Sequence, residues 1–312
     1  MSRLRRKGKS EMCCLFGVYD YTGGLTAAQK RRLVSALATA SEARGTDATG
    51  VAYNSDGHLA VYKRPWPAHL MRFRLPENVR CIIGHTRMTT QGDEKKNCNN
   101  HPFVGTSGMP FALAHNGIIY NDKELRQERK LPDTNIETDS YIAVQLLEQQ
   151  GKLNFSTIRT AAEALEGTLT LTILDKRDNL YIVKGNNPLV LYHFPRLGVY
   201  VYASTEQILK KGLKKGMSVK ERPFEIPLRE GDILRINRSG HYTGETFDTR
   251  NLWDSRPHFL WPYADVAPDG EYIRDLKSVA PAYGYTAQDI DIFLGYGLCA
   301  EEIEEIMCCG EV

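Results

Sequence analysis

The chain has no hydrophobic run long enough to cross a membrane and no marked excess of charge of either sign. No stretch approaches the ~18 consecutive apolar residues that a transmembrane helix needs. The formal net charge is only +2, so no overall field favours nucleic acid or a membrane surface. A short basic tail, residues 3–9, lacks the apolar region of a secretory signal. These absences disfavour membrane, secreted and general nucleic-acid-binding proteins, and we expect a cytoplasmic protein.

The seven cysteines include no Cys-x-x-Cys pair. An odd number of cysteines in a chain of this length indicates reduced thiols rather than a disulfide framework. Cys98 and His101 could form half of a zinc site, but no second ligand pair stands at a recognisable spacing. We therefore expect neither a metal nor another cofactor.

The composition is that of a globular protein, because 42% of the residues are hydrophobic and 25% are charged, enough for a full core. Residues 1–12 are polar and without period, which predicts a leader or alternative-start segment that is removed or disordered. Residues 13–245 contain short apolar runs separated by turns. Residues 246–312 begin as an irregular, proline-rich arm and end in a predicted helical hairpin, which packs on the core or docks a partner.

The order of predicted elements indicates an α+β fold. Thr26 and Gln29 form a capping-box pattern at the start of a helix that should run to about Ala43. A turn at residues 55–57 joins two apolar runs and predicts a hairpin. Further strands are expected at residues 14–19, 79–83, 111–114, 169–173, 180–183, 189–192, 199–202 and 233–236, and helices at 138–150 and 156–165. This is not a regular βαβ alternation, so we expect antiparallel sheets with segregated helices.

Cys13 follows a methionine at the start of an apolar run. If everything before it were removed, its own α-amino group, with a pKa near ~7.7 to 8.0, could accept the thiol proton directly or through one water. The thiolate is the attacking form of cysteine. On these residues alone, a buried strand cysteine is the competing interpretation.

Four polar clusters stand where predicted strands end or helices begin, and side chains at such positions can converge on one cleft. In chain order they are residues 44–50 (RGTDATG), 84–92 (GHTRMTTQG), 115–117 (HNG) and 137–139 (ETD). Each residue singled out below has a structural alternative. Arg87 could pair with a surface carboxylate, Asp139 could stabilise a helix N-terminus, Asn116 could form a turn, and His101 could be a core histidine.

With Cys13 in front, these clusters resemble, in the same order, the motifs of class II glutamine amidotransferases, the N-terminal-nucleophile glutaminases. The leading Cys-Gly-Ile-Phe-Gly of the family is similar to residues 13–17, its Arg-Gly-x-Asp-x-x-Gly to 44–50, its Gly-His-Thr-Arg-Trp-Ala-Thr-His-Gly to 84–92, its Asn-x-His-Pro to 99–102, its His-Asn-Gly-Ile-Ile to 115–119 and its Glu-Thr-Asp to 137–139. The resemblance covers about residues 13–240.

The resemblance implies a four-layer αββα sandwich and hydrolysis of free L-glutamine to glutamate and ammonia through a thioester on Cys13. It implies that Arg87 binds the α-carboxylate of glutamine and that Asp139 binds the α-ammonium. The Asn116 side-chain amide and the Gly117 backbone N–H would stabilise the negative charge that grows on the carbonyl oxygen. Two more residues, Thr90 and His101, match family positions that line the glutamine pocket.

Three of the departures from the family pattern bear on the site. Cys14 replaces the glycine at the second position, although strand alternation should turn its side chain away from the cleft. Met88 and Gln91 stand where the family has Trp and His, which bears on how the glutamine loop closes and on the turnover rate. A further condition is that Cys13 is internal in this sequence, so activity requires removal of residues 1–12 or a start at Met12 followed by trimming of that methionine.

Only about 70 residues follow the resemblance, and they contain no phosphate loop of the GxxxxGK[ST] type. We therefore expect a stand-alone glutaminase domain that feeds ammonia to a separate synthase. Two alternatives stay open: a hydrolase of another γ-glutamyl amide, and a non-catalytic module that senses glutamine. The sequence determines neither the ammonia acceptor nor the oligomeric state.

Overall fold

The computed structural model describes residues 13–217, 221–252, 270–295, 303, 306 and 307. The chain divides into two compact units, Met1–Arg256 and Pro257–Val312, which are described separately. Within the described residues, no helix is both long and apolar enough to span a bilayer.

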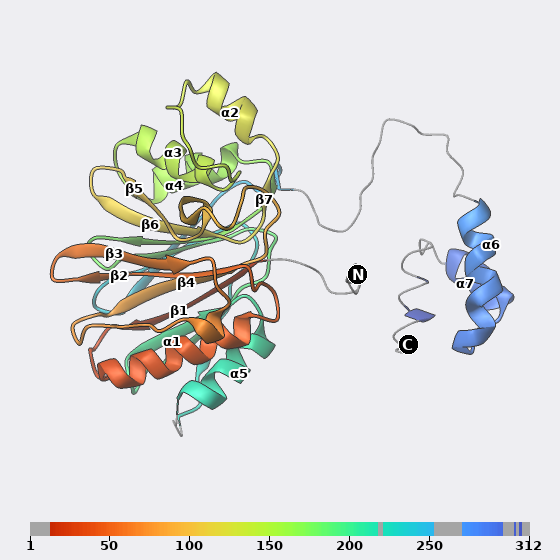
Figure 1. Cartoon of the computed structure of the whole chain (residues 1–312), viewed down its shortest axis with the longest axis horizontal. Helices are drawn as coiled ribbons and strands as arrows, with labels where there is room; N and C mark the ends of the chain where they lie inside the picture. The colour runs from red at the N-terminus through yellow and green to blue at the C-terminus, as the bar shows by residue number, and fades with distance from the viewer. Residues whose placement is uncertain (1–12, 218–220, 253–269, 296–302, 304–305, 308–312) are drawn as a thin grey trace. The chain divides into compact units, whose positions relative to one another are not determined.

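The larger unit is built on two stacked antiparallel sheets (Figure 1). The first sheet contains, in spatial order, β13 (Phe224–Ile226), β11 (Val190–Phe194), β12 (Val199–Ala203), β1 (Cys14–Asp20), β4 (Cys81–Arg87), β2 (Ala48–Ser55) and β3 (His58–Arg64). The second contains β15 (Tyr242–Thr246), β14 (Asp232–Ile236), β10 (Leu180–Lys184), β9 (Thr170–Asp175), β6 (Pro110–His115) and β5 (Phe103–Thr106). A short pair, β7 (Ile118–Ile119) and β8 (Gly167–Thr168), stands apart from both sheets.

Helices cover the outer face of each sheet, so the unit has four layers (Figure 1). Two helices, α1 (Ala27–Ser41) and α5 (Glu206–Gly216), share an apolar core with the first sheet. The second sheet shares another core with α2 (Asp122–Glu128), α3 (Tyr141–Gln150) and α4 (Phe155–Ala164). A third apolar cluster fills the space between the sheets. The unit is therefore the αββα sandwich that the resemblance implied.

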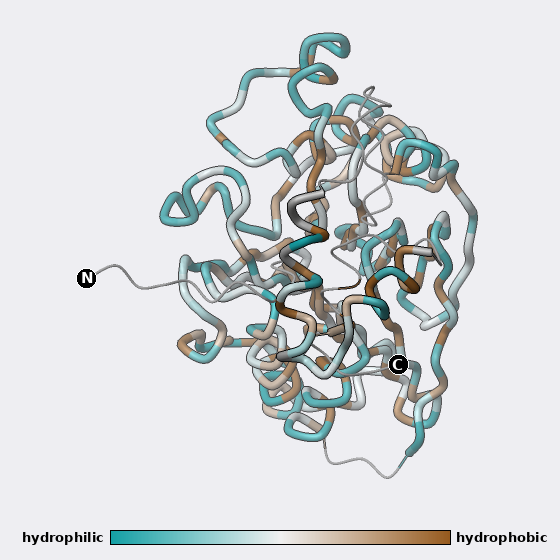
Figure 2. The backbone as a smooth tube through the Cα atoms, turned by 90° about the vertical axis from the view of Figure 1, so that its right-hand side faces the viewer, coloured by the Kyte–Doolittle hydropathy of each residue, from teal (hydrophilic) through white to brown (hydrophobic). Residues whose placement is uncertain are grey.

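Strand alternation explains how one strand can serve two cores. The side chains of Cys14, Phe16 and Val18 on β1 face the helix-side cluster, whereas Leu15 and Tyr19 face the layer between the sheets. All seven residues of β1 are buried. Cys14 therefore points into the core beneath α1. Figure 2 shows that hydrophilic residues dominate the loops that project at the edges of the view.

Several local predictions are confirmed. The Thr26 hydroxyl accepts a hydrogen bond from the Gln29 backbone N–H, and the Gln29 side chain accepts one from the Thr26 backbone, so the capping box begins α1 as predicted. The helix ends at Ser41, two residues before the predicted end. The turn at residues 55–57 joins β2 and β3, with Ser55 paired to His58. The helices predicted at 138–150 and 156–165 correspond to α3 and α4.

The smaller unit contains a helix that the sequence reasoning missed. Helix α6 (Gly270–Val279) begins where an irregular arm was expected, and a 3-10 turn, η3 (Ala280–Tyr283), follows it. The first helix of the predicted hairpin is α7 (Ala287–Gly295), whereas most of the second, predicted at residues 300–307, lies outside the described residues.

Helix α6 covers part of the apolar stripe of the predicted hairpin, and the expectation that the hairpin packs on the main core or docks a partner stays a prediction. Leu276 of this helix packs with Ile290, Ile303 and Met307 in a small core of their own. Proline and glycine upstream of α6 dominated the sequence signal, which hid the helix.

Candidate active site

The β1–β4 pairing brings Cys13 beside the end of β4. These strands are antiparallel, with Cys14 opposite Thr86, so the residue before β1 meets the residues that close and follow β4. The Cys13 sulfur lies 3.4 Å from both the backbone nitrogen and the carbonyl oxygen of Met88. The hydrogen-bond contacts of the candidate nucleophile's sulfur are therefore with backbone atoms.

The alternation of both sheets directs the other candidates to the same place. Ile83 on β4 faces the layer between the sheets, so Arg87, four residues on, is on the same face. Ala112 and Ala114 on β6 face that layer from the other sheet, and Asn116 follows at the same two-residue spacing. Both sheets therefore turn polar side chains inward at the edge where these strands end.

Six of the seven predicted site residues line one cavity with five others. The lining consists of Cys13, Arg87, Met88, Thr90, Gln91, His101, His115, Gly117, Thr138, Asp139 and Ser140. The volume in which the centre of a water molecule can lie is about 10 Å³, so the cavity has room for roughly one water molecule. The seventh predicted residue, Asn116, is fully buried beside Gly117 and is not part of this lining. The cavity is too small for a larger molecule, which fits only if part of its wall moves.

Arg87 is 4% exposed, and its guanidinium is already engaged by the loop that follows it. One terminal nitrogen donates to Asn100 Oδ1 at 2.8 Å, and the other donates to the carbonyl oxygens of Gln91 and Gly92. Burial lowers the pKa of Arg87 from its usual value, while nearby acidic groups, Asp139 among them, oppose that shift. Because a guanidinium carries five N–H groups, two of them remain for an incoming anion.

Asp139 is a buried carboxylate held by its own helix end and by β7. Its Oδ2 accepts a hydrogen bond from the Ile119 backbone N–H at 2.6 Å, and its Oδ1 lies 3.4 Å from the Ser140 hydroxyl. The side chain is 3% exposed and contributes to the field at the Cys13 sulfur, as Arg87 does with the opposite sign. A fixed anion and a fixed cation thus both act on the thiol.

Asn116 and Gly117 offer hydrogen-bond donors without acceptors. The Asn116 backbone N–H donates to the Thr170 carbonyl oxygen at 2.9 Å, and the Thr170 N–H donates to the Asn116 carbonyl oxygen at 3.0 Å. Both polar atoms of the buried Asn116 side-chain amide are nevertheless unpaired within the part of the chain that the structure describes. Native proteins rarely leave such groups unpaired without a functional reason. Among the same residues, no acceptor contacts the Gly117 N–H. The arrangement is suited to receiving an oxygen atom from a ligand.

Glycine is required at position 117 by both conformation and space. Its φ is +150°, and an added Cβ would lie 1.9 Å from the Thr168 carbonyl oxygen and 2.5 Å from His115 Nε2. A larger residue would force β8 away and rotate the free N–H out of the cavity.

The Cys13 thiol is protonated at neutral pH in this environment. Burial raises its pKa to about 11, although the Met88 backbone hydrogen bond and the charge of Arg87 act in the opposite direction. A base is therefore needed to form the thiolate.

Arg44 is a site residue that the sequence reasoning did not single out. Its Nε donates to the Cys13 carbonyl oxygen at 3.0 Å. An added Cβ on the neighbouring Gly45 would lie 2.5 Å from the Arg87 carbonyl carbon, so this loop packs directly on the end of β4. The signal was present, since Arg44 opens the RGTDATG cluster, but nothing in that cluster indicated which residue would reach Cys13.

Three buried histidines form a cluster at the cavity, and His101 and His115 are part of its lining. His101 Nδ1 lies 3.0 Å from His85 Nε2, which lies 3.0 Å from the His115 carbonyl oxygen. His115 Nδ1 lies 2.8 Å from the Ser140 hydroxyl. His101 thus combines both interpretations offered for it, a core histidine that also lines the cavity.

Thr90 lies at the exposed rim of the cavity. Among the described residues, no group of three or more His, Cys, Asp or Glu side chains could hold a metal ion.

The histidine cluster predicts loss of stability at mildly acid pH. Burial is the largest cause that lowers the pKa of all three, and the pKa of His85 falls to about 3. Because an unfolded histidine titrates near ~6.5, the unfolded chain binds more protons below that pH, and each buried histidine should cost up to ~1.4 kcal/mol of unfolding free energy per pH unit. Urea unfolding at about pH 7 and about pH 5 measures this slope.

Matched histidine variants separate this cluster from other titrating groups. His85→Asn should flatten the slope, whereas replacing the exposed His58 by Asn should leave it unchanged. Equal stability at both pH values in the unsubstituted protein would contradict the assignment of these histidines as neutral and buried.

The sequence comparisons agree with this geometry. Residues 85–211 match the family model described as a glutamine amidotransferase domain. Glutamine–fructose-6-phosphate aminotransferase (isomerizing) of Bacillus thuringiensis subsp. konkukian is 35% identical over 242 residues, which cover 73% of this chain and 39% of the relative. The enzyme of that name from Halalkalibacterium halodurans is 26% identical over 81% of this chain and 43% of its own length. The chain thus spans less than half the length of these curated relatives.

Two solved structures share the fold. Glutamine phosphoribosylpyrophosphate amidotransferase from B. subtilis, complexed with ADP and GMP, superposes with a TM-score of 0.59 at 20% identity, over 88% of this chain and 59% of that one. The allosteric regulatory enzyme of purine biosynthesis gives a TM-score of 0.60 at 20% identity, over 78% and 53% of the two chains. Motifs, fold and sequence similarity together show that this chain contains a glutamine amidotransferase domain of class II, the N-terminal-nucleophile family.

Proposed function

We propose that this chain hydrolyses the side-chain amide of free L-glutamine to glutamate and ammonia, with Cys13 as the nucleophile. One observation carries the proposal: Cys13, Arg87 and Asp139 line a single small cavity, next to the Asn116 amide, which has no hydrogen-bond partner among the described residues. Free glutamine has an α-carboxylate, an α-ammonium and an amide that match these groups in charge and hydrogen bonding.

Recognition of the amino-acid end selects a free amino acid. In the proposal, Arg87 binds the α-carboxylate and Asp139 the α-ammonium, so a glutamine within a polypeptide lacks both partners. To bind a carboxylate through two parallel hydrogen bonds, the guanidinium needs two adjacent free N–H groups. One of these groups now donates to the Gln91 carbonyl oxygen. Glutamine binding therefore includes displacement of the Gln91–Gly92 backbone, which also enlarges the cavity. Thr90 and His101 are proposed to line the enlarged pocket.

The proposed reaction begins with proton transfer from the Cys13 thiol to the α-amine of the same residue. The thiolate adds to the amide carbon of glutamine, and the negative charge on the former carbonyl oxygen is stabilised by the Asn116 amide and the Gly117 N–H. The C–N bond then breaks, and the leaving nitrogen takes the proton from the α-ammonium of Cys13 and departs as ammonia. Water hydrolyses the remaining thioester, which releases glutamate and restores the thiol.

The amine requirement links activity to the removal of residues 1–12. While the Met12–Cys13 peptide bond is intact, the Cys13 nitrogen is an amide and cannot take a proton from a thiol with a pKa of about 11. Intact-mass measurement of the active protein should give a chain that begins at Cys13. Glutamate release by a protein that retains residue 12 would contradict the role proposed for the Cys13 amine, whereas an inactive native protein that retains residue 12 would leave the glutamine-sensing alternative.

The ammonia is proposed to pass to a separate synthase in the cytoplasm. In this division, residues 13–245 form the amidotransferase domain and residues 246–312 dock the partner. The relatives named above are aminotransferases, enzymes whose names imply transfer of the glutamine nitrogen to an acceptor, which supports the proposed use of the ammonia by a synthase. The exposed Val279, Tyr283 and Ile292 of the smaller unit offer apolar contact area for such docking. Pull-down from the native host and identification of a co-purifying synthase tests this point.

Arg87→Lys should raise the KM for glutamine at least about tenfold and change kcat much less, because a point charge replaces a planar fork. Steady-state glutamate release measures both constants. The α-amide of glutamine, which lacks the carboxylate, should bind the original protein and the variant almost equally. Equal KM values for glutamine would show that Arg87 does not contact the carboxylate.

A matched control uses the arginine just before the same strand. Arg80 is half-buried, and its guanidinium donates to the Tyr21 carbonyl oxygen rather than to a group of the cavity. Arg80→Lys should therefore leave the KM for glutamine unchanged. A similar KM increase in this variant would indicate that the Arg87 effect comes from general loss of packing.

A further inference from the structure

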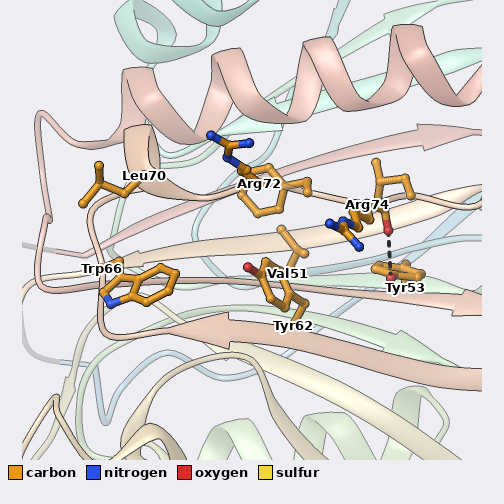
Figure 3. A pocket seen from close by; sticks show the side chains of 9 residues that line it. Val51, Tyr53, Tyr62, Trp66, Leu70, Arg72 and Arg74 are labelled. Atoms are coloured by element: carbon orange, nitrogen blue, oxygen red, sulfur yellow. Dashed lines mark hydrogen bonds between the residues drawn. The ribbon is translucent and has the colours of Figure 1, made fainter.

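A second cavity lies between the β2–β3 hairpin and the chain that follows it (Figure 3). Its volume is about 470 Å³, within the usual range of small-molecule sites. Trp66 and Leu70 lie at one end, and Tyr53 and Arg74 lie at the other. No residue that lines it also lines the cavity around Cys13. It is therefore separate from the proposed glutamine site.

Aromatic side chains dominate the walls of this cavity. Tyr62 and Phe73 meet edge to face with ring centroids 6.3 Å apart, which fixes the orientation of both rings. Trp66 is 45% exposed and Leu70 is 55% exposed, so large apolar surfaces stand open at the mouth. Exposed apolar patches around a hollow commonly mark binding sites, and a flat indole face suits a planar ring.

Two arginines give the cavity its charge. Met71, Phe73 and Leu75 are buried while Arg72 and Arg74 between them are exposed, so both guanidinium groups lie on one side of an extended segment. Within the described residues, neither guanidinium has an ion pair or a hydrogen bond, and no carboxylate lines the cavity. Guanidinium forks match the oxygens of phosphate and carboxylate groups. The lining thus combines a surface for a planar ring with an unneutralised anion site.

We propose that this cavity binds a nucleoside phosphate, with the base against Trp66 and the phosphate at Arg72 and Arg74. Two guanidinium groups offer more donors than one carboxylate can accept from, which favours a phosphate. A volume of about 470 Å³ suits one small molecule rather than an extended chain. The proposal does not depend on the function of the Cys13 site.

Calorimetric titration of the full chain with AMP, adenosine and inorganic pyrophosphate tests both halves of the recognition. AMP should bind saturably, and adenosine and pyrophosphate should each bind at least about tenfold more weakly, because each lacks one of the two contacts. Absence of AMP binding, or pyrophosphate binding as tight as AMP binding, would overturn the proposal. Tighter binding of an acidic peptide with an aromatic residue would also overturn it, in favour of a peptide site.

Variants locate the binding in this cavity. The double variant Arg72→Gln/Arg74→Gln should lower the affinity for AMP to that for adenosine, and Trp66→Ala should lower it about tenfold. The control Arg129→Gln/Arg177→Gln removes the same charge from exposed positions outside the cavity and should change nothing. Cys13→Ala should also keep full AMP affinity. Unchanged AMP affinity in the Arg72/Arg74 variant, or its loss in Cys13→Ala, would contradict the assigned location.

Discussion

Cys13→Ala is expected to bring glutamate release below detection while glutamine still binds. On the proposed mechanism, every bond change at the amide carbon involves the Cys13 sulfur, and no other thiol lines the cavity. Loss of a covalent nucleophile in comparable enzymes costs roughly 10⁶-fold in kcat. Arg87 and Asp139 remain in place, so the amino-acid end keeps its partners. Glutamate release by a coupled assay and glutamine binding by calorimetry give the two quantities.

A cysteine outside the site provides the control. Cys98 is half-buried in the loop that follows Gly92 and does not line the cavity. Cys98→Ala should retain the activity of the unsubstituted protein. If Cys13→Ala turned over glutamine at the original rate, Cys13 would not be the nucleophile. If it lost glutamine binding as well, the separation between recognition and chemistry proposed above would be wrong.

Asn116→Ala is expected to lower kcat by about 10²- to 10³-fold with little change in KM, as loss of one oxyanion donor does elsewhere. The side-chain amide has no partner among the described residues, so its removal breaks no existing hydrogen bond there. The effect should therefore appear in the transition state and not in folding. Steady-state kinetics together with thermal unfolding of the same samples separate the two.

A second buried asparagine gives the opposite expectation. Asn54 on β2 donates through Nδ2 to the Asp175 carbonyl oxygen and to the Asp178 side chain, both at 2.8 Å, and lies outside the cavity. Asn54→Ala should lower the unfolding temperature and leave kcat unchanged while the protein is folded. If Asn116→Ala behaved in the same way, Asn116 would be a structural residue and another group would have to bind the oxyanion.

Much of the fold followed from local patterns. The capping box at Thr26 depends on residues three apart, and the β2–β3 turn on three consecutive residues, so neither needed knowledge of distant contacts. Helix α6 was missed because proline and glycine upstream of it dominated the sequence signal, and its apolar residues pack with segments that follow it. The apolar stripe of the predicted hairpin itself led to the expectation that it packs on the main core or docks a partner.

The candidate site, too, was predicted from the sequence only in part. Motif order pointed to Cys13, Arg87 and Asp139, which line the same cavity although up to 126 positions separate them. No motif indicated that Arg44 would contact the Cys13 carbonyl oxygen, or that the Gln91 carbonyl oxygen would accept a hydrogen bond from the Arg87 guanidinium. Such contacts depend on the path of loops, and loop paths are decided by what packs beneath them.

Residue types in a fixed order, and short-range signals for helices and turns, were enough to identify an αββα glutaminase-like domain with a cysteine at its head. Only the tertiary structure decided that the cavity around Cys13 has room for about one water molecule and that the Asn116 amide has no partner in the part of the chain that the structure describes. It also decided that an aromatic cavity lies beside the β2–β3 hairpin, with two arginines that have no ion pair in the same part of the chain. The physical reason is that cavities and unpaired polar groups depend on strand register and sheet stacking, which involve segments far apart in the chain. Motifs and helix caps depend only on residues that are close together in the sequence.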